Sequence, residues 1–509
     1  MKQIKENKLS LIGSVSLGTG VMIGAGIFVL MGQIAELVGE IFPLAFLVGA
    51  IVVSFSAYSY VKFSNAYPSA GGVAMFMRKA YGPGTMAGTF ALLMYVSMVI
   101  AQSLVARTFG SYSLRLFAIE NTAYLVPALG VVLIAIAYLV NVSGNKAIER
   151  TANITAIIKI AGIALLALAG LAFAGFPSMD SWGQTISTGV NGATGATGGV
   201  FNFVAALALS ILAFKGFTTI TNQGDDIIDP HKNLGRSIIL SVLICTIIYT
   251  LLALSVSSSL SVEEIIAAKN YALAAAARPV FGDWGLILTV ILAIVATVSG
   301  LIASVFSASR MLGMLSAMKQ LPQLYRGLKN PALVFTVALA IILTILFDLT
   351  RIASIGAIFY LIMDIAIHWG LFRFLLKETK SNPVIPLIAI ILDVIILGAF
   401  ILMKYQSDPL VLLVSLVGFI VILLTQRLFM ITHTNAKGEM AMEMEMQAGG
   451  AMSMGAMSMG AMSMGDMGGM NKKSAGEETA GKKSTEENSG GHDKMEMGKD
   501  DMGKDDMGK

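Results

Sequence analysis

The sequence contains little charge and almost no cysteine. Only 13% of its 509 residues are Asp, Glu, Lys or Arg, and the single cysteine is Cys245. One thiol excludes an intramolecular disulfide framework. So small a charged fraction argues against a soluble globular protein, because a soluble surface of this size needs more polar groups. The formal net charge of +4 is small, so we also expect no binding to nucleic acid.

Apolar residues are abundant instead, and they come in long runs. They make up 56% of the chain, and runs of about twenty residues can cross about 30 Å of hydrocarbon as helices. We therefore predict an all-α membrane protein in contact with membrane lipid, with about twelve transmembrane helices. The first run is too long and too rich in glycine for a cleavable signal peptide. The predicted spans are 9–37, 43–63, 84–110, 123–142, 152–175, 199–223, 236–259, 284–317, 331–348, 352–376, 384–404 and 408–430.

Basic residues predict the orientation. If the amino terminus is cytoplasmic, most Lys and Arg residues near the spans lie in inner loops. The outer loops then contain only Arg107, Arg115, Lys269, Arg278, Arg351 and Lys404. Because positive charge accumulates on the cytoplasmic side, we expect a multi-pass protein of the cell membrane with both termini in the cytoplasm. The number of subunits does not follow from this pattern.

The composition changes near residue 435, and we predict a transmembrane domain over 1–434 followed by a cytoplasmic tail over 435–509. The tail repeats Ala-Met-Ser-Met-Gly, has no aromatic residue and cannot bury a core, so we expect it to be disordered. Its thioethers suit Cu(I) or Ag(I), but cytoplasmic thiols would compete for these ions. We therefore expect no metal and no cofactor, although a metal-handling membrane protein stays open as an alternative.

Two spans contain residues that weaken a helix at mid-membrane. The first has Gly20, Gly24 and Gly26, and the sixth has Lys215 followed by Gly216. Unwound backbone survives in a membrane only where a cavity or a ligand satisfies it. Breaks at corresponding places in two halves indicate an inverted-repeat transporter with a central site, where freed amides suit a carboxylate. Alternatively, these glycines only permit close helix packing.

Several motifs together resemble the amino acid–polyamine–organocation (APC) permeases over about residues 9–430. They are Gly24-Ala25-Gly26-Ile27-Phe28, Tyr67-Pro68-Ser69-Ala70-Gly71-Gly72, Ala213-Phe214-Lys215-Gly216-Phe217, the segment 225–233, and Ser309-Arg310-Met311-Leu312 before Leu321-Pro322. The sequence departs from the family at Lys62, where an acid is frequent, at Gly235, where proline is frequent, and at Lys319-Gln320 in place of Asp-Gly. These departures concern gating and substrate class rather than the fold.

The resemblance implies a LeuT-type fold, with five plus five inverted helices, two extra helices, and breaks in helices 1 and 6. It also implies two sets of substrate-binding residues. The backbone that would hold a substrate carboxylate belongs to Ile23, Gly24, Ala25, Gly26 and Ile27. The carbonyl groups that would hold the amino group lie at Phe214, Lys215, Gly216 and Phe217. Leu212 stands where the family has an aromatic gate.

Ionisable residues inside the spans each need a reason, because a charge in the membrane costs a few kcal/mol. The resemblance places Lys159 where other members hold a sodium ion between helices 1, 5 and 8. There it could carry a proton and donate to carbonyls near Met22 and to Ser299. Alternatively, Lys159 extends to the inner interface. Asp364 and His368 are spaced i, i+4, which indicates a local pair; without a third nearby ligand we expect no metal there.

We therefore predict a secondary transporter rather than an enzyme, and four scattered histidines form no hydrolytic or redox constellation. The favoured hypothesis is proton-coupled symport of a small neutral amino acid by alternating access, with H⁺ as the coupling ion. A sodium-coupled carrier and an amino-acid or amine exchanger are alternatives within transport. A non-transporting nutrient sensor that signals through its tail is an alternative of another class.

Deletion of residues 436–509 should leave the transport rate per inserted molecule nearly unchanged. The tail lacks the apolar periodicity needed to dock on the helices, so its removal exposes no core. Uptake normalised to the amount of protein in the membrane measures this. Abolished uptake by correctly inserted protein would show that the tail is a functional domain.

Overall fold

The computed structural model describes residues 8–117, 119, 124–143, 145–175, 198–322 and 328–432. Within these residues the chain is helical between its turns, and an isolated bridge joins Leu9 to Ile227. The all-α prediction is therefore confirmed for this part of the chain. The predicted tail lies outside the described residues, so its disorder and the boundary at 434/435 stay predictions.

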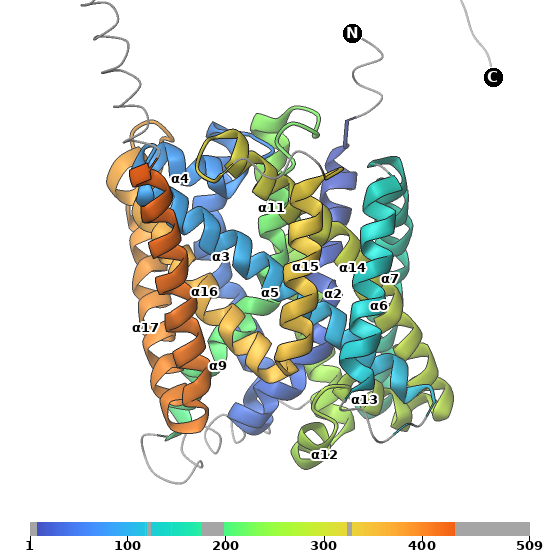
Figure 1. The fold of residues 1–509 in the computed structure, drawn as a ribbon. Helices are drawn as coiled ribbons and strands as arrows, with labels where there is room; N and C mark the ends of the chain where they lie inside the picture. The colour runs from blue at the N-terminus through green and yellow to red at the C-terminus, as the bar shows by residue number, and fades with distance from the viewer. Residues whose placement is uncertain are drawn as a thin grey trace, which may run out of the picture. The chain divides into compact units, whose positions relative to one another are not determined.

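Every predicted span has a helical counterpart (Figure 1). Ten helical stretches are long and apolar enough to cross a membrane, and the first of them contains two helices joined by the 3₁₀ turn η1 (Gly39–Ile41). The sixteen-residue helix α15 is shorter than these. The helices that correspond to the predicted spans are α2 (Leu11–Val38), α3 (Phe42–Ala66), α5 (Thr85–Arg115), α6 (Leu125–Ser143), α7 (Asn145–Ala174), α9 (Gly198–Phe214), α11 (Pro230–Ser259), α14 (Asp283–Ala317), α15 (Pro331–Leu346), α16 (Leu349–Gly370), α17 (Val384–Ser407) and the helix Pro409–Thr432.

Short helices lie at the two ends of the bundle. In Figure 1, α4 (Val73–Tyr81) is at one end, whereas α12 (Val262–Ala267) and α13 (Ala272–Phe281) are at the other. A capping box formed by Ser261 and Glu264 starts α12, which satisfies amide groups that have no partner inside the helix.

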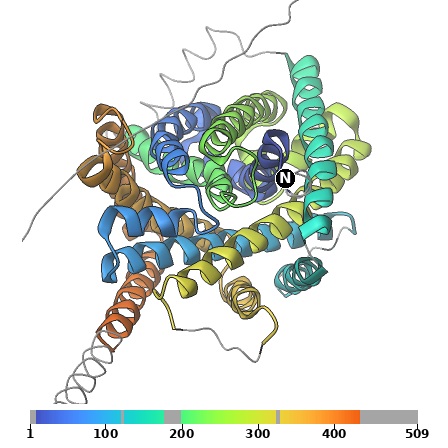
Figure 2. The ribbon, with the colours of Figure 1, turned by 90° about the horizontal axis from the view of Figure 1, so that it is seen from above.

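The buried core is formed by helices from both halves of the chain. Figure 2, which views the helices end on, shows α2 enclosed by its neighbours. Apolar side chains of α6, α17 and the helix 409–432 are instead exposed, among them Leu139, Leu402 and Leu428. Exposed apolar faces of this kind match a lipid surrounding. The chain is therefore an integral, multi-pass membrane protein.

Only one of the two predicted helix breaks is present. Span six is interrupted after α9 by the 3₁₀ turn η2 (Lys215–Phe217), which leads into the short helix α10 (Thr218–Thr221). Helix α2, in contrast, is α-helical from Leu11 to Val38, so the predicted break in helix 1 is wrong for this conformation. The intrahelical hydrogen bonds of α2 already satisfy its backbone. Its glycines serve close approach to other helices instead.

Candidate functional site

A small cavity lies at the interruption of span six. Its volume is about 50 Å³, which leaves room for one or two water molecules at about 30 Å³ each. Five of the residues singled out from the sequence line it: Met22, Gly26, Leu212, Lys215 and Gly216. The remaining lining residues come mainly from α2, α5 and α14 and are Val21, Leu30, Met98, Ala101, Leu104, Val105, Ala213, Thr218, Thr219 and Ser304.

The two sides of the cavity are in contact through their backbones. A Cβ atom on Gly216 would lie 2.4 Å from the amide nitrogen of Met22. A Cβ atom on Gly26 would lie 2.7 Å from the carbonyl oxygen of Ala213. Real Cβ atoms do not approach other atoms so closely, so only glycine allows α2 to meet η2 and the end of α9 at this distance.

Other residues of the predicted substrate site point elsewhere. Ile23 and Ile27 are buried in the core but do not line the cavity. Phe214 packs against Tyr249, with ring centroids 4.9 Å apart, and Phe217 packs edge-on against Tyr60 at 5.1 Å. These side chains position the backbone of span six rather than contact the cavity.

Gly24 and Ala25 are the remaining residues of the predicted carboxylate-binding segment, and Gly24 does not line the cavity either. Gly24 faces α14, where an added Cβ would lie 3.3 Å from the Cα of Gly300. The backbone of Ala25 belongs to the continuous helix α2, and its side chain lies outside the described part of the structure. The predicted carboxylate-binding turn is therefore a packed helical turn here.

The sequence prediction missed Tyr249 on α11. Its hydroxyl lies 2.5 Å from the carbonyl oxygen of Met22 and 3.3 Å from that of Ala213. Tyr249 thus links α2 to the end of α9, beside the cavity. The only signal in the sequence was a tyrosine inside an apolar span, and tyrosine hydroxyls in such positions commonly need a partner.

Lys159 on α7 is buried, with 1% of its surface exposed. Its ammonium group donates to the carbonyl oxygen of Gly20 at 3.1 Å and to the hydroxyl of Ser299 at 2.8 Å. It therefore joins α7 to α2 and α14. The carbonyl it contacts on α2 is that of Gly20, whereas the carbonyl of Met22 accepts from Tyr249. The alternative in which Lys159 extends to the membrane surface does not match this position.

Lys215 places a second amine beside the cavity. It donates to the hydroxyl of Ser97 on α5, and its nitrogen lies 5.2 Å from the ring centroid of Tyr360 on α16. Ammonium groups are attracted to aromatic faces at this distance. Lys215 is thus held within the bundle, where its charge can influence a bound solute.

Polar contacts close the bundle on both sides of the cavity. Toward the amino-terminal end of α2, Arg310 pairs with Asp226, and the hydroxyl of Ser14 donates to Gln223 at 2.5 Å. Toward its carboxyl-terminal end, the Tyr112 hydroxyl donates to the carbonyl oxygen of Phe28 at 2.9 Å. The cavity therefore lies between two layers of contacts along α2.

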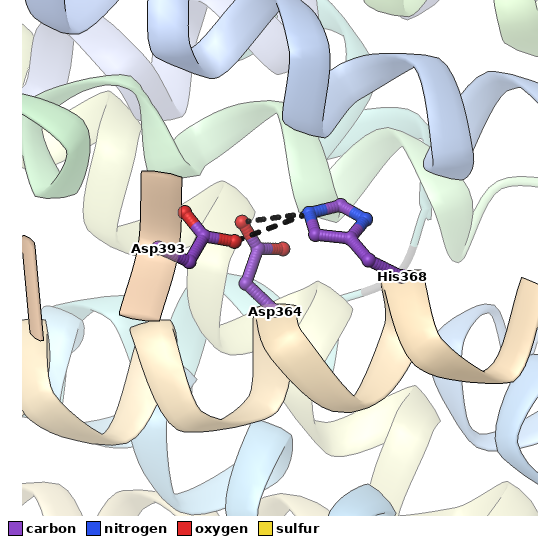
Figure 3. A group of neighbouring side chains, drawn as sticks. All are labelled: Asp364, His368 and Asp393. Atoms are coloured by element: carbon purple, nitrogen blue, oxygen red, sulfur yellow. Dashed lines mark ion pairs between the residues drawn. The ribbon is translucent and has the colours of Figure 1, made fainter. Parts of the chain in front are cut away.

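The structure also joins Asp393 on α17 to the predicted pair of Asp364 and His368 on α16 (Figure 3). The imidazole Nε2 of His368 lies 3.5 Å from Asp364 Oδ2, so the local pair is confirmed, and 3.4 Å from Asp393 Oδ2. The sequence analysis expected no metal here because it found no third ligand near this pair. The structure places Asp393 beside the pair, so that premise is wrong.

Comparisons with known proteins agree with a transport function. The sequence profile of the family described as "Amino acid permease" matches residues 9–435. The inner membrane transport protein YbaT of Escherichia coli is 29% identical, over 77% of this chain and 89% of its own. The serine/threonine exchanger SteT of Bacillus subtilis is 24% identical, over 81% and 95%. The branched-chain amino acid permease BcaP of Bacillus subtilis is 28% identical, over 46% and 50%.

Gly26→Val should abolish substrate binding while the protein still inserts into the membrane. The added side chain would collide with Ala213 and force α2 away from the cavity wall. The control is Gly398→Val, because a Cβ atom at Gly398 meets nothing within 4 Å. Equilibrium binding of radiolabelled amino acids to purified protein, with gel filtration as the folding check, measures this. Full transport by Gly26→Val would show that the close contact is dispensable.

Proposed function

The chain belongs to the amino acid permease family, and we propose that it carries a small neutral amino acid together with a proton into the cell by alternating access. Transport of amino acids follows from the family and its relatives. The finer proposal rests chiefly on one observation, the enclosed cavity between α2, α5, η2 and α14. We place the protein in the cell membrane with both termini in the cytoplasm, on the distribution of basic residues.

The cavity is where the substrate would bind. It lies at the interruption of span six, where a 3₁₀ turn replaces regular α-helix and carbonyl groups can turn toward a ligand. It is too small for an amino acid in this enclosed conformation, so binding requires α2 and η2 to separate. Their contact through Gly26 and Gly216 uses little side-chain interdigitation, which makes such a separation feasible. For backbone amides of α2 to receive the substrate carboxylate, the turn at Gly24 and Gly26 would also have to unwind, because it is helical in this conformation.

Size and charge favour a small neutral substrate. Lys215 lines the cavity, and a cationic side chain about 5 Å from it would be repelled by roughly 3 kcal/mol at an effective dielectric of 20. We therefore disfavour arginine, lysine and polyamines as substrates.

Lys159 is our candidate for the proton carrier. Its protonated amine donates to Gly20 on α2 and to Ser299 on α14, so the proton holds three helices together. Loss of the proton removes charge from these bonds and weakens them, because bonds to charged donors are about twice as strong as neutral ones. Release of α2 would then favour opening to the inside. Proton and substrate would thus move together.

Exchange of two amino acids is the second candidate function. SteT, which aligns with this chain over most of its length, is named as a serine/threonine exchanger. An exchanger returns with a second solute bound and needs no net proton movement. Counterflow alone does not separate the two candidates, whereas net uptake into substrate-free proteoliposomes does.

Uptake of the substrate should rise as the external pH falls, should need no sodium, and should be lost in Lys159→Ala. Without the amine, neither Gly20 nor Ser299 receives the charged donor that ties α7 to them. Lys404→Ala is the matched control, because Lys404 is also buried but lies beside Phe400, on α17. Net uptake by proteoliposomes at several external pH values measures this. Sodium-dependent and pH-insensitive uptake by the wild type would refute proton coupling.

Lys215→Met should increase the uptake of basic amino acids relative to neutral ones. Removal of roughly 3 kcal/mol of repulsion would raise the affinity for basic relative to neutral amino acids, with an upper limit of about 100-fold. Competition by a panel of neutral, acidic and basic amino acids measures the selectivity. The control is Lys377→Met, because Lys377 is exposed and does not line the cavity. An unchanged profile would show that Lys215 does not face the substrate.

A further inference from the structure

Three polar side chains meet inside the bundle at a place that the proposed transport cycle does not use. Asp364, His368 and Asp393 are each no more than 1% exposed. One ligand atom from each lies within 4.8 Å of the other two. Figure 3 shows the two carboxylates and the imidazole ring turned toward one another, with Asp393 reaching in from α17.

The spacing of these atoms differs from that of hydrogen bonds. The distances from His368 Nε2 to the two carboxylate oxygens are 3.5 and 3.4 Å, whereas N–H···O hydrogen bonds measure about 2.7–3.2 Å. Ligand atoms at about 2.0–2.2 Å from a tetrahedral zinc ion lie about 3.3–3.6 Å from each other. Both observed distances fall in that interval.

Several of these atoms have no other partner among the described residues. Neither carboxylate oxygen of Asp393 takes part in a hydrogen bond there, and neither does Nε2 of His368. A buried polar atom without a partner costs about 1–3 kcal/mol, more when it is charged. Asp393 is therefore a buried carboxylate without a hydrogen bond, held at ion-pair distance from an imidazole nitrogen, and this spacing fits an ion shared between them.

Helix α3 orients two of the three side chains. Ser59 Oγ lies 2.8 Å from Nδ1 of His368, while the hydroxyls of Ser56 and Tyr60 donate to the two oxygens of Asp364, each at 2.6 Å. A neutral imidazole that donates its Nδ1 proton to Ser59 presents the lone pair of Nε2 to both carboxylates. That arrangement repels unless a proton or a metal cation occupies the centre. Outer hydrogen bonds of this kind fix the tautomer and orientation of metal ligands.

From this geometry we propose that Asp364, His368 and Asp393 bind a divalent transition-metal ion, with Zn²⁺ as the best-fitting representative. Imidazole and carboxylate are ligands that suit zinc. Two carboxylates, a neutral imidazole and one dication also sum to zero charge, which suits an apolar interior. The second oxygen of Asp393 is free to complete four-coordination.

The ion would join the extra helix α17 to α16 and, through the hydroxyl groups, to α3. This junction adjoins the interruption of span six, because Tyr60 contacts both Asp364 and Phe217. The metal would therefore brace the helices behind η2.

Zinc content tests the proposal on the full chain. Protein purified in detergent is treated with a chelator, incubated with Zn²⁺, desalted and analysed by mass spectrometry for metal per chain. Wild type should hold one more zinc ion than Asp393→Asn and than His368→Gln. His231→Gln is the matched control, because that imidazole is exposed and contacts only the backbone oxygen of Asn65. It should retain the wild-type zinc content.

Two further readouts do not depend on those variants. Co²⁺ bound to the chelator-treated wild type should produce intense visible bands typical of a tetrahedral site, and excess Zn²⁺ should abolish them. Ser59→Ala, which keeps all three ligands, should weaken Zn²⁺ binding by about 10–100-fold. Both measurements proceed without transport, so their failure is distinct from a failure of the proposed transport function.

Equal zinc content in wild type and in folded Asp393→Asn would overturn the proposal, and so would a wild type that shows no cobalt bands. In that case protons, rather than a metal ion, neutralise the cluster. The thermal unfolding temperature at different pH values, with and without Zn²⁺, separates the two. A rise on adding Zn²⁺ in wild type and in His231→Gln, absent in Asp393→Asn, supports the metal site.

Discussion

The backbone contact between α2 and the interrupted span six is the constraint on which the rest of the structure depends. Gly26 against Ala213, and Gly216 against Met22, bring two main chains together at distances that no larger residue permits. The cavity lies beside this contact, Tyr249 bridges its two sides, and Lys159 donates to α2 at Gly20, on another face of the helix.

Buried polar groups connect helices that are distant from one another in the sequence. Lys159 links α7, α2 and α14, Lys215 links η2 to α5, and the cluster of Asp364, His368 and Asp393 links α16, α17 and, through hydroxyl groups, α3. In an apolar interior each such group requires a partner. The partners therefore specify which helices are neighbours.

Only part of the site could be predicted from glycine patterns. The break that the sequence predicted at Lys215 and Gly216 is present in the structure. Gly20, Gly24 and Gly26 contain the same weakness, yet α2 remains helical, because its own hydrogen bonds are satisfied and its glycine faces are covered by Ala213 and Gly300. Glycine permits either outcome, and the neighbouring helices select one. The inverted relation of the two halves stays a prediction from the same pattern.

The sequence by itself determined the number and approximate bounds of the spans, because the length of an apolar run is a local property that the thickness of a membrane selects. It also showed the pair of Asp364 and His368, since one helix turn sets that spacing. The tertiary structure alone decided that Asp393 joins them and that Tyr249 reaches the carbonyl of Met22. Such contacts depend on how separate helices pack and rotate against one another. The spacing of residues within a single helix does not specify that packing.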